Sequence, residues 1–154
     1  MQPQLQKMMK DAISSVLETM FFLAPAYDEG ESLQSFQREP FFLESSITIT
    51  GKVQLLRFLF RVTRNFASTM TANFLGVGQE EVAVEEMEDT LKELANMVGG
   101  ACLARLPSDN WGLGIPKIEQ PKTNPDDYLG PNMCTIILSL DEEPMAVIHL
   151  YLDQ

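Results

Sequence analysis

Apolar positions repeat along this chain with two different periods, one typical of helices and one typical of strands. Residues 4–20 carry an apolar stripe at helical spacing, formed by Leu5, Met8, Ala12, Val16 and Met20. Residues 46–50 then alternate apolar and polar, Gly51 and Lys52 supply a turn, and residues 53–60 return as a second strand. The start of the chain therefore predicts a helix followed by a β-hairpin.

Two more helical patterns follow the hairpin. The first is a stripe that ends at Gly76 and consists of Val62, Phe66, Met70 and Phe74. The second is longer and predicts a helix over about residues 82–106. Its apolar stripe consists of Val84, Met87, Leu91, Leu94, Ala95, Val98 and Cys102. Carboxylates crowd its first turns, where the helix dipole favours negative charge, and Pro107 stops it.

The end of the chain returns to strand patterns. We expect the strands within about residues 41–60, 111–120, 132–140 and 144–152. Residues 28–40 are polar and read as a loop, and residues 120–131, rich in Pro, Asn and Asp, are the best candidate for a mobile loop. The predicted fold class is α/β of the α+β type. It is one domain over residues 1–154, with helices packed on an antiparallel sheet in the order α-β-β-α-α-β-β-β.

A carboxylate and a carboxamide stand three residues apart in the long helix. At about 100° per residue, Glu93 and Asn96 project from one face, with Asp89 one turn before them and Gly100 one turn after. The apolar stripe lies on the opposite face. We therefore expect Glu93 and Asn96 to point away from the core, toward solvent or a partner.

Two interpretations of this face compete. A solvated helix surface is the ordinary one, because a Glu and an Asn at this spacing are common by chance. The other starts from Asn96, a mediocre helix former whose donor and acceptor would be free for another molecule. Gly99 and Gly100 follow, each costing about 1 kcal/mol against Ala inside a helix. They indicate either a closely approaching partner or close packing on a neighbouring helix.

Composition narrows the class of protein. The chain has 154 residues, 45% of them apolar, which suffices for a buried core and argues against disorder. Its net charge of −11 argues against nucleic acid and against an anionic membrane surface as partners. No apolar run approaches the roughly 20 residues that span a membrane, and the start lacks a signal-peptide pattern.

The few metal-ligating and nucleophilic residues form no cluster. Cys102 and Cys134 are far apart and read as small core residues of a reduced, cytoplasmic protein. His149 lies in the last predicted strand with no nucleophile or acid in its pattern, so we interpret it as structural. The sequence therefore predicts no metal site, and it contains no phosphate-binding glycine loop.

The residues 89–100, DTLKELANMVGG, resemble the signature helix of the CheC/CheX/FliY group of chemotaxis phosphatases. That motif is an acidic residue or Ser, then Glu four residues on, then Asn three residues further, which Asp89, Glu93 and Asn96 match. The hydrophobic residues and glycines that follow also match. A single copy in a chain of this length looks most like CheX, because CheC-type proteins usually carry two such helices.

The resemblance implies an activity, a partner and a role for each residue. The activity is hydrolysis of the aspartyl phosphate on a CheY-like response regulator. Asn96 would position the attacking water, and Glu93 would pair with the receiver's active-site Lys. Gly100 would let the helix lie close to the receiver, and for Asp89 a rim contact or a plain N-terminal charge both fit. Mg²⁺ would be bound by the receiver, and this chain would need no cofactor of its own.

One departure from the family pattern keeps a second interpretation open. The family has a proline about 22 residues after the Asn, but this chain has Glu119 there, with Pro116 and Pro121 on either side. The alternative function is a non-catalytic module that docks on a receiver or a flagellar-switch protein. The resemblance also implies a homodimer formed through β-strands, for which the apolar residues 135–138 and 146–148 are candidates.

Overall fold

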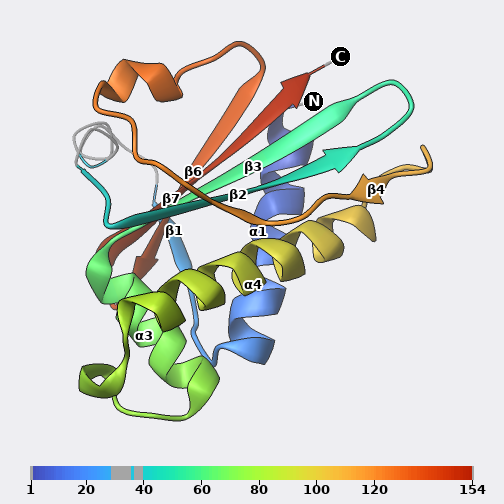
Figure 1. Cartoon of the computed structure of the whole chain (residues 1–154). Coiled ribbons are helices and arrows are strands. Elements are labelled where there is room, and N and C mark those ends of the chain that lie inside the picture. Colours follow the sequence, from blue (N-terminus) through green and yellow to red (C-terminus); the bar gives the residue numbers. More distant parts are fainter. Residues whose placement is uncertain (1, 29–35, 37–39, 154) are drawn as a thin grey trace.

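The computed structural model describes residues 2–28, 36 and 40–153 (Figure 1). The helices are α1 (Gln2–Met20), α3 (Arg64–Leu75) and α4 (Val84–Leu103), with short 3₁₀ turns η1 (Gln79–Glu81) and η2 (Pro125–Tyr128). The strands are β1 (Ala26–Asp28), β2 (Leu43–Thr50), β3 (Leu55–Val62), β4 (Gly112–Leu113), β5 (Lys117–Glu119), β6 (Met133–Leu140) and β7 (Glu143–Asp153). The expected α+β class, with helices on an antiparallel sheet, is confirmed.

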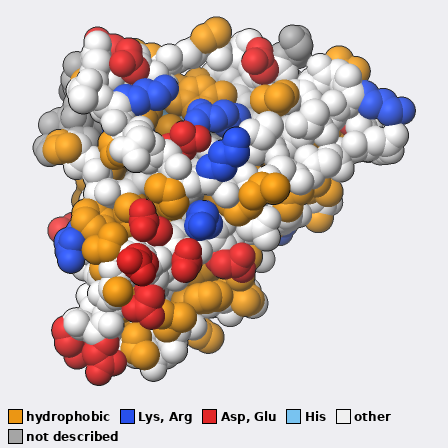
Figure 2. Space-filling view, in the orientation of Figure 1, with side chains coloured by type: hydrophobic (Ala, Val, Ile, Leu, Met, Phe, Trp, Pro, Cys, Tyr) orange, Lys and Arg blue, Asp and Glu red, His pale blue; other side chains and the backbone are white. Residues whose placement is uncertain are grey.

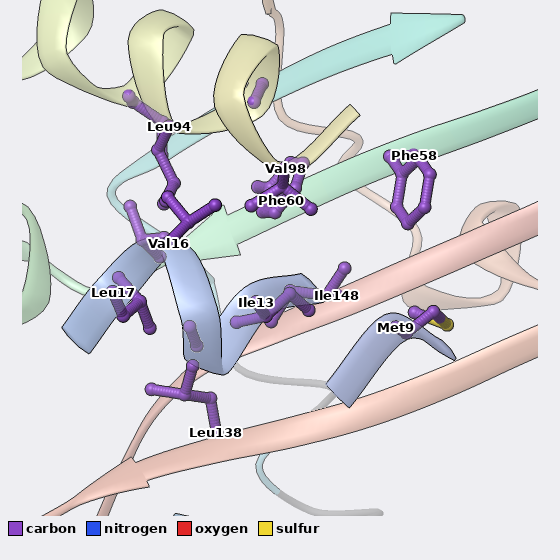
Figure 3. Packing of buried hydrophobic residues seen from close by; sticks show 14 of the residues in the cluster. Met9, Ile13, Val16, Leu17, Phe58, Phe60, Leu94, Val98, Leu138 and Ile148 are labelled. Carbon is purple, nitrogen blue, oxygen red and sulfur yellow. The ribbon is translucent and has the colours of Figure 1, made fainter. Parts of the chain in front are cut away.

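The strands of the described residues form one antiparallel sheet in the order β1-β6-β7-β3-β2-β4, with β5 also paired to β2. Figure 1 shows α1 and α4 crossing one face of this sheet. The core fills the space between those helices and the sheet (Figure 3). It contains Met9, Ile13 and Leu17 from α1, Leu94 and Val98 from α4, and Phe58, Phe60, Leu138 and Ile148 from the strands. Burying these side chains fixes which face of α4 turns inward.

Several predicted boundaries were wrong by a few residues. The long helix covers 84–103, and the acidic stretch before it forms the separate turn η1, because Ala83 is extended with ψ of 155°. Val84 and Met20 are more than 40% exposed, and each is the terminal residue of its helix. Val62 belongs to β3, and α3 starts after Thr63, whose hydroxyl accepts the Phe66 N–H.

The strand expected over 111–120 is two short pieces, and β1 was not predicted. Both β4 and β5 pair with β2, and the N–H of Gly114 between them donates to the Thr48 carbonyl at 2.8 Å. Pro116 has no N–H to continue the ladder, so the strand breaks there. β1 is a three-residue edge strand on β6. Of the loop expected at 28–40, residues 29–35 and 37–39 lie outside the described residues.

The segment 120–131 is anchored to the sheet, which corrects the expectation of a mobile loop. Tyr128 is 3% exposed, and its hydroxyl donates to the Glu44 carboxylate. The Lys122 N–H donates to the Tyr128 hydroxyl at 2.8 Å, and the Tyr151 hydroxyl donates to the Tyr128 carbonyl at 2.7 Å. These contacts lie on the face of the sheet away from α1 and α4.

The two C-terminal strands lie inside the sheet. β6 lies between β1 and β7, and β7 lies between β6 and β3. They turn at Asp141 and Glu142, which both have positive φ, so the turn is one residue shorter than the gap between the strands expected over 132–140 and 144–152. The apolar residues 135–138 and 146–148 therefore serve the sheet's own packing, and dimerisation through them stays a prediction.

Candidate functional site

Helix α4 is held by a cap at its start and by a buried stripe along its length. The Glu86 carboxylate accepts the Ala83 N–H at 2.9 Å, which satisfies one of the free donors at the helix start. The buried residues are Met87, Thr90, Leu91, Leu94, Ala95, Val98, Gly99 and Cys102. The stripe packs on β2 and α1. The rotation of the helix about its axis is thereby set.

This rotation brings the predicted polar pair to the outer face. Glu93 is exposed and Asn96 is half-buried. Neither side chain makes a hydrogen bond or an ion pair with any part of the chain that the structure describes. Asp89 is exposed one turn earlier, with a carboxylate oxygen 3.6 Å from the Lys92 ammonium nitrogen. The carboxamide of Asn96 therefore keeps its donor and its acceptor available.

The two glycines after Asn96 have different surroundings. A Cβ on Gly99 would lie 2.8 Å from Leu113 Cδ1 and 3.4 Å from Ile47, so Gly99 lets α4 pack closely on the sheet. A Cβ on Gly100 would meet nothing within 4 Å. Of the two explanations offered by the sequence, close packing applies to Gly99, against strands rather than a helix. Gly100 instead leaves a stretch of bare backbone on the outer face.

A shallow depression of about 260 Å³ lies beside this face. Its lining consists of Phe74, Leu75, Glu86, Asp89, Thr90 and Glu93, so it runs between the end of α3 and the first half of α4. Figure 2 shows acidic side chains gathered over this part of the molecule, next to apolar ones. The exposed carboxylates of η1 and α4 are those of Glu80, Glu81, Glu85, Glu86, Asp89 and Glu93. The outer face of α4 is therefore strongly negative around a small apolar hollow.

A second polar cluster, which the sequence interpretation missed, is buried on the other face of the sheet. Glu44 and Arg61 are directly opposite in the β2–β3 register and are 2% and 3% exposed. Arg61 Nε lies 3.5 Å from a Glu44 oxygen, and its guanidinium stacks on the Tyr128 ring at 3.6 Å from the centroid. Burial raises the pKa of the Glu44 carboxyl, which the Tyr128 hydrogen bond and the Arg61 charge oppose. The sequence signal that could have indicated this cluster is the pair of opposite charges, Glu44 and Arg61, that flank the predicted hairpin.

His149 belongs to this buried cluster. Arg61 Nη1 lies 3.3 Å from His149 Nε2, and Thr135 Oγ1 lies 2.8 Å from Nδ1. A guanidinium can only donate, so Nε2 accepts and the proton resides on Nδ1, which donates to Thr135. Burial and the Arg61 charge lower the pKa of His149 from 6.5 to about 3. His149 is neutral and fully engaged, which agrees with its structural interpretation.

Other reactive groups in the described residues are not placed for catalysis. Cys102 and Cys134 are free and buried, and burial raises the pKa of the Cys102 thiol to about 12. Across residues 2–28, 36 and 40–153, no three His, Cys, Asp or Glu side chains come together as metal ligands. None of the helices in these ranges combines the length and the apolar character needed to cross a bilayer.

Comparison with known proteins supports the resemblance seen in the signature helix. A family model described as chemotaxis phosphatase CheX matches residues 44–124, which is more than half of the chain and includes the whole of α4. No curated protein sequence matches significantly.

Solved structures match the fold over almost the whole chain. The chemotaxis protein CheX from Vibrio vulnificus is 17% identical with a TM-score of 0.73, covering 96% of this chain and 95% of that one. A CheX from Desulfovibrio desulfuricans is 15% identical with a TM-score of 0.73, covering 97% and 99%. A CheX–CheY–BeF₃–Mg²⁺ complex from Borrelia burgdorferi is 12% identical with a TM-score of 0.70, covering 97% of each chain. At these identities the likeness shows the fold.

Proposed function

The chain belongs to the CheX family of chemotaxis phosphatases, and we propose that it hydrolyses the aspartyl phosphate of a CheY-like response regulator. The observation that carries this proposal is the pair Glu93 and Asn96, which share the outer face of α4 and have no partner among the described residues. The fold likeness to a CheX solved in complex with CheY, BeF₃ and Mg²⁺ supports the choice of a receiver as partner.

The reaction requires little from this protein beyond positioning the attacking water. An acyl phosphate is already activated, and Mg²⁺ bound by the receiver would polarise the phosphoryl group. Water attacks phosphorus, the bond from phosphorus to the Asp oxygen breaks, and the products are inorganic phosphate and the free carboxylate. A carboxamide can accept a hydrogen bond from the attacking water or donate one to it, as Gln does in GTPases. We assign that role to Asn96.

Asn96 is suited to this role by its support. It is half-buried on a helix whose opposite face is locked into the core, so its position varies little relative to the sheet. Rates of positioned reactions are sensitive to displacements of about 1 Å, which favours a rigid carrier. The open space at Gly100 would let a receiver approach the backbone of α4 one turn beyond Asn96.

Glu93 is assigned to docking. Its exposed carboxylate would pair with the Lys of the receiver's active site and move that ammonium group away from the phosphoryl oxygens. Asp89, already close to Lys92, would contribute a rim charge. A protein that acts on such receivers would work in the cytoplasm, where the free thiols of Cys102 and Cys134 remain reduced.

The test separates the two roles by substituting each residue. Asn96→Ala should slow hydrolysis by about a hundredfold with nearly unchanged receiver affinity, because the carboxamide acts on the water in the transition state. Glu93→Ala should weaken the complex by about thirtyfold or more, since it removes half of an ion pair that docking desolvates. Phosphate release and binding to a phosphorylated receiver are measured for both variants.

Glu18→Ala is the matched control, because Glu18 is also an exposed helical glutamate but belongs to α1. It should leave binding and hydrolysis unchanged. If the wild-type protein binds a phosphorylated receiver and leaves its phosphate lifetime unaltered, the phosphatase role is wrong. The chain would then be a docking module.

A further inference from the structure

The depression beside Glu93 has an apolar floor that remains partly open. Phe74 stacks on Phe21, with ring centroids 5.1 Å apart, and forms a fixed wall. Leu75 is 43% exposed at the last position of α3. The chain turns away immediately afterwards, because Gly76 adopts φ of 72° and caps the helix. An apolar side chain entering the depression from outside would cover Leu75.

Thr90 brings a polar group without an internal partner to the depression. It is 3% exposed and lines the depression, yet its hydroxyl makes no hydrogen bond within the part of the chain that the structure describes. A threonine inside a helix ordinarily donates to the carbonyl four residues back, as Thr71 does to Ala67 at 2.7 Å. Among the described residues, Arg61 Nε is the one fully buried side-chain nitrogen or oxygen without a partner, so the Thr90 oxygen keeps some solvent contact in the free protein. A bound molecule that reached this hydroxyl could donate a hydrogen bond to it or accept one from it.

The rim of the depression is negative. Glu86, Asp89 and Glu93 all line it, and only Asp89 has a cation nearby among the described residues, Lys92 at 3.6 Å. The molecule as a whole carries a charge of −11. An occupant that fits this rim carries Lys or Arg beside its apolar group. A second copy of this chain would bring like charges together and is disfavoured.

We propose that this depression is a docking pocket for the receiver, which inserts an apolar side chain flanked by Lys or Arg and hydrogen-bonds the Thr90 hydroxyl. The proposal rests on the proposed function, because Glu93 lines both the depression and the assigned docking site. The pocket would select among receivers: those that carry the apolar and basic pair bind, and those that lack it do not.

The test is the affinity for a CheY receiver domain loaded with Mg²⁺ and beryllofluoride, which mimics the phosphoryl group without being hydrolysed. Leu75→Gln should weaken binding by about tenfold, since it removes apolar area from the contact. Asp89→Lys should weaken it by about tenfold through charge reversal. The matched controls lie at the opposite end of the molecule, at the β2–β3 turn and the end of β7 (Figure 1). They are Val53→Gln, at an apolar residue 73% exposed, and Asp153→Lys, and each should bind within about twofold of wild type.

Thr90→Val is the sharpest variant, because it keeps the shape of the side chain and removes the hydroxyl. We expect binding to weaken by about fivefold while the thermal midpoint stays nearly unchanged, since the hydroxyl makes no hydrogen bond within the described residues. A Thr90→Val protein that loses stability together with affinity would show that the hydroxyl supports the fold only, and would overturn the proposal.

The affinity measurements and the hydrolysis measurements test the docking pocket and the phosphatase role independently of each other. Wild-type hydrolysis with receiver affinity unaffected by Leu75→Gln and Thr90→Val overturns the docking pocket and leaves the phosphatase role intact. Receiver binding that depends on Leu75 and Thr90 without any hydrolysis supports the pocket and refutes the phosphatase role. Self-association of the wild-type chain that Leu75→Gln abolishes would show that a second copy occupies the depression, which also overturns the proposal.

Discussion

Asn96 and His149 are both polar residues on elements that also carry apolar stripes, but they differ in burial and in hydrogen bonding. His149 has a partner on each ring nitrogen and is 1% exposed. Asn96 is half-buried with no partner in the described residues. Satisfied, buried polar groups such as His149 stabilise one arrangement of the core. Groups that are accessible and unsatisfied, such as Asn96, are available to another molecule.

The neutral state of His149 predicts a pH dependence of stability. The unfolded chain protonates this histidine near pH 6.5, whereas the folded protein resists protonation down to about pH 3. Lowering the pH through this window therefore favours the unfolded state, by up to about 1.4 kcal/mol per pH unit. The raised pKa of Glu44 acts in the opposite direction above its usual value of 4.5, because the folded state then takes up the proton first.

His149→Gln isolates the histidine contribution, because Gln cannot titrate and the Glu44 contribution remains. Between pH 6.5 and pH 5, the free energy of unfolding should fall less steeply in the variant than in wild type. Urea denaturation at several pH values measures the two slopes. Equal slopes would mean that His149 is protonated in the folded protein, in conflict with its contact to Arg61.

The long helices and strands could be predicted from their periodicity, whereas the short strands form because they pair with a long neighbour. The helices α1 and α4 and the strands β6 and β7 each carry enough repeats to be recognised from the chain alone. β1, β4 and β5 have three residues or fewer and exist because they pair with a long strand. Their sequences hold too few residues to show a period, so the sheet edges could not be predicted.

Gly100 in α4 allows a test of how closely the receiver approaches this helix. Gly100→Ala should raise the free energy of unfolding by about 0.5–1 kcal/mol, because Ala is the better helix former and the space around its Cβ is empty. The same change should weaken receiver binding, because the methyl group stands where the partner backbone approaches. Thermal denaturation and a receiver titration measure the two effects.

Gly99→Ala serves as the comparison within the same helix. Its methyl group would press on Leu113 and Ile47 inside the protein, so the gain in helix propensity should be offset and receiver binding should stay the same. A Gly100→Ala protein that is more stable and binds the receiver as tightly as wild type would contradict the assigned approach of the partner to Gly100.

In the whole molecule, the site includes residues on the outer face of one helix and a depression that forms only where two helices meet. The outer position of Glu93 could be predicted from the period of α4 and agrees with the structure. The depression needs α3 beside α4, and the buried cluster joins Tyr128 to Glu44, 84 residues apart. No local pattern encodes such pairings. The roles assigned to Asp89, Glu93, Asn96 and Gly100 stay predictions, as do the homodimer and the receiver's Mg²⁺.

The distribution of charge predicts how the complex responds to salt. Carboxylates around the depression would attract a basic patch on the receiver, and ions screen such attraction over about 10 Å at 0.1 M. The association rate should therefore fall by about tenfold between 0.05 and 0.5 M NaCl, while dissociation changes less. Stopped-flow mixing measures both rates, and Asp89→Asn should reduce the salt dependence. An association rate independent of salt would show that these carboxylates do not steer the encounter.

The role of the Asn96 carboxamide in positioning the attacking water can be measured from the decay of a phosphorylated receiver at saturating concentrations of this protein. Wild type is compared with Asn96→Ala and with Asn96→Gln, which keeps the amide and moves it outward by one methylene. We predict fast decay with wild type and decay slower by about a hundredfold with both variants, because the amide must be in place as well as present. Decay as fast with Asn96→Ala as with wild type would show that the Asn96 carboxamide does not position the water.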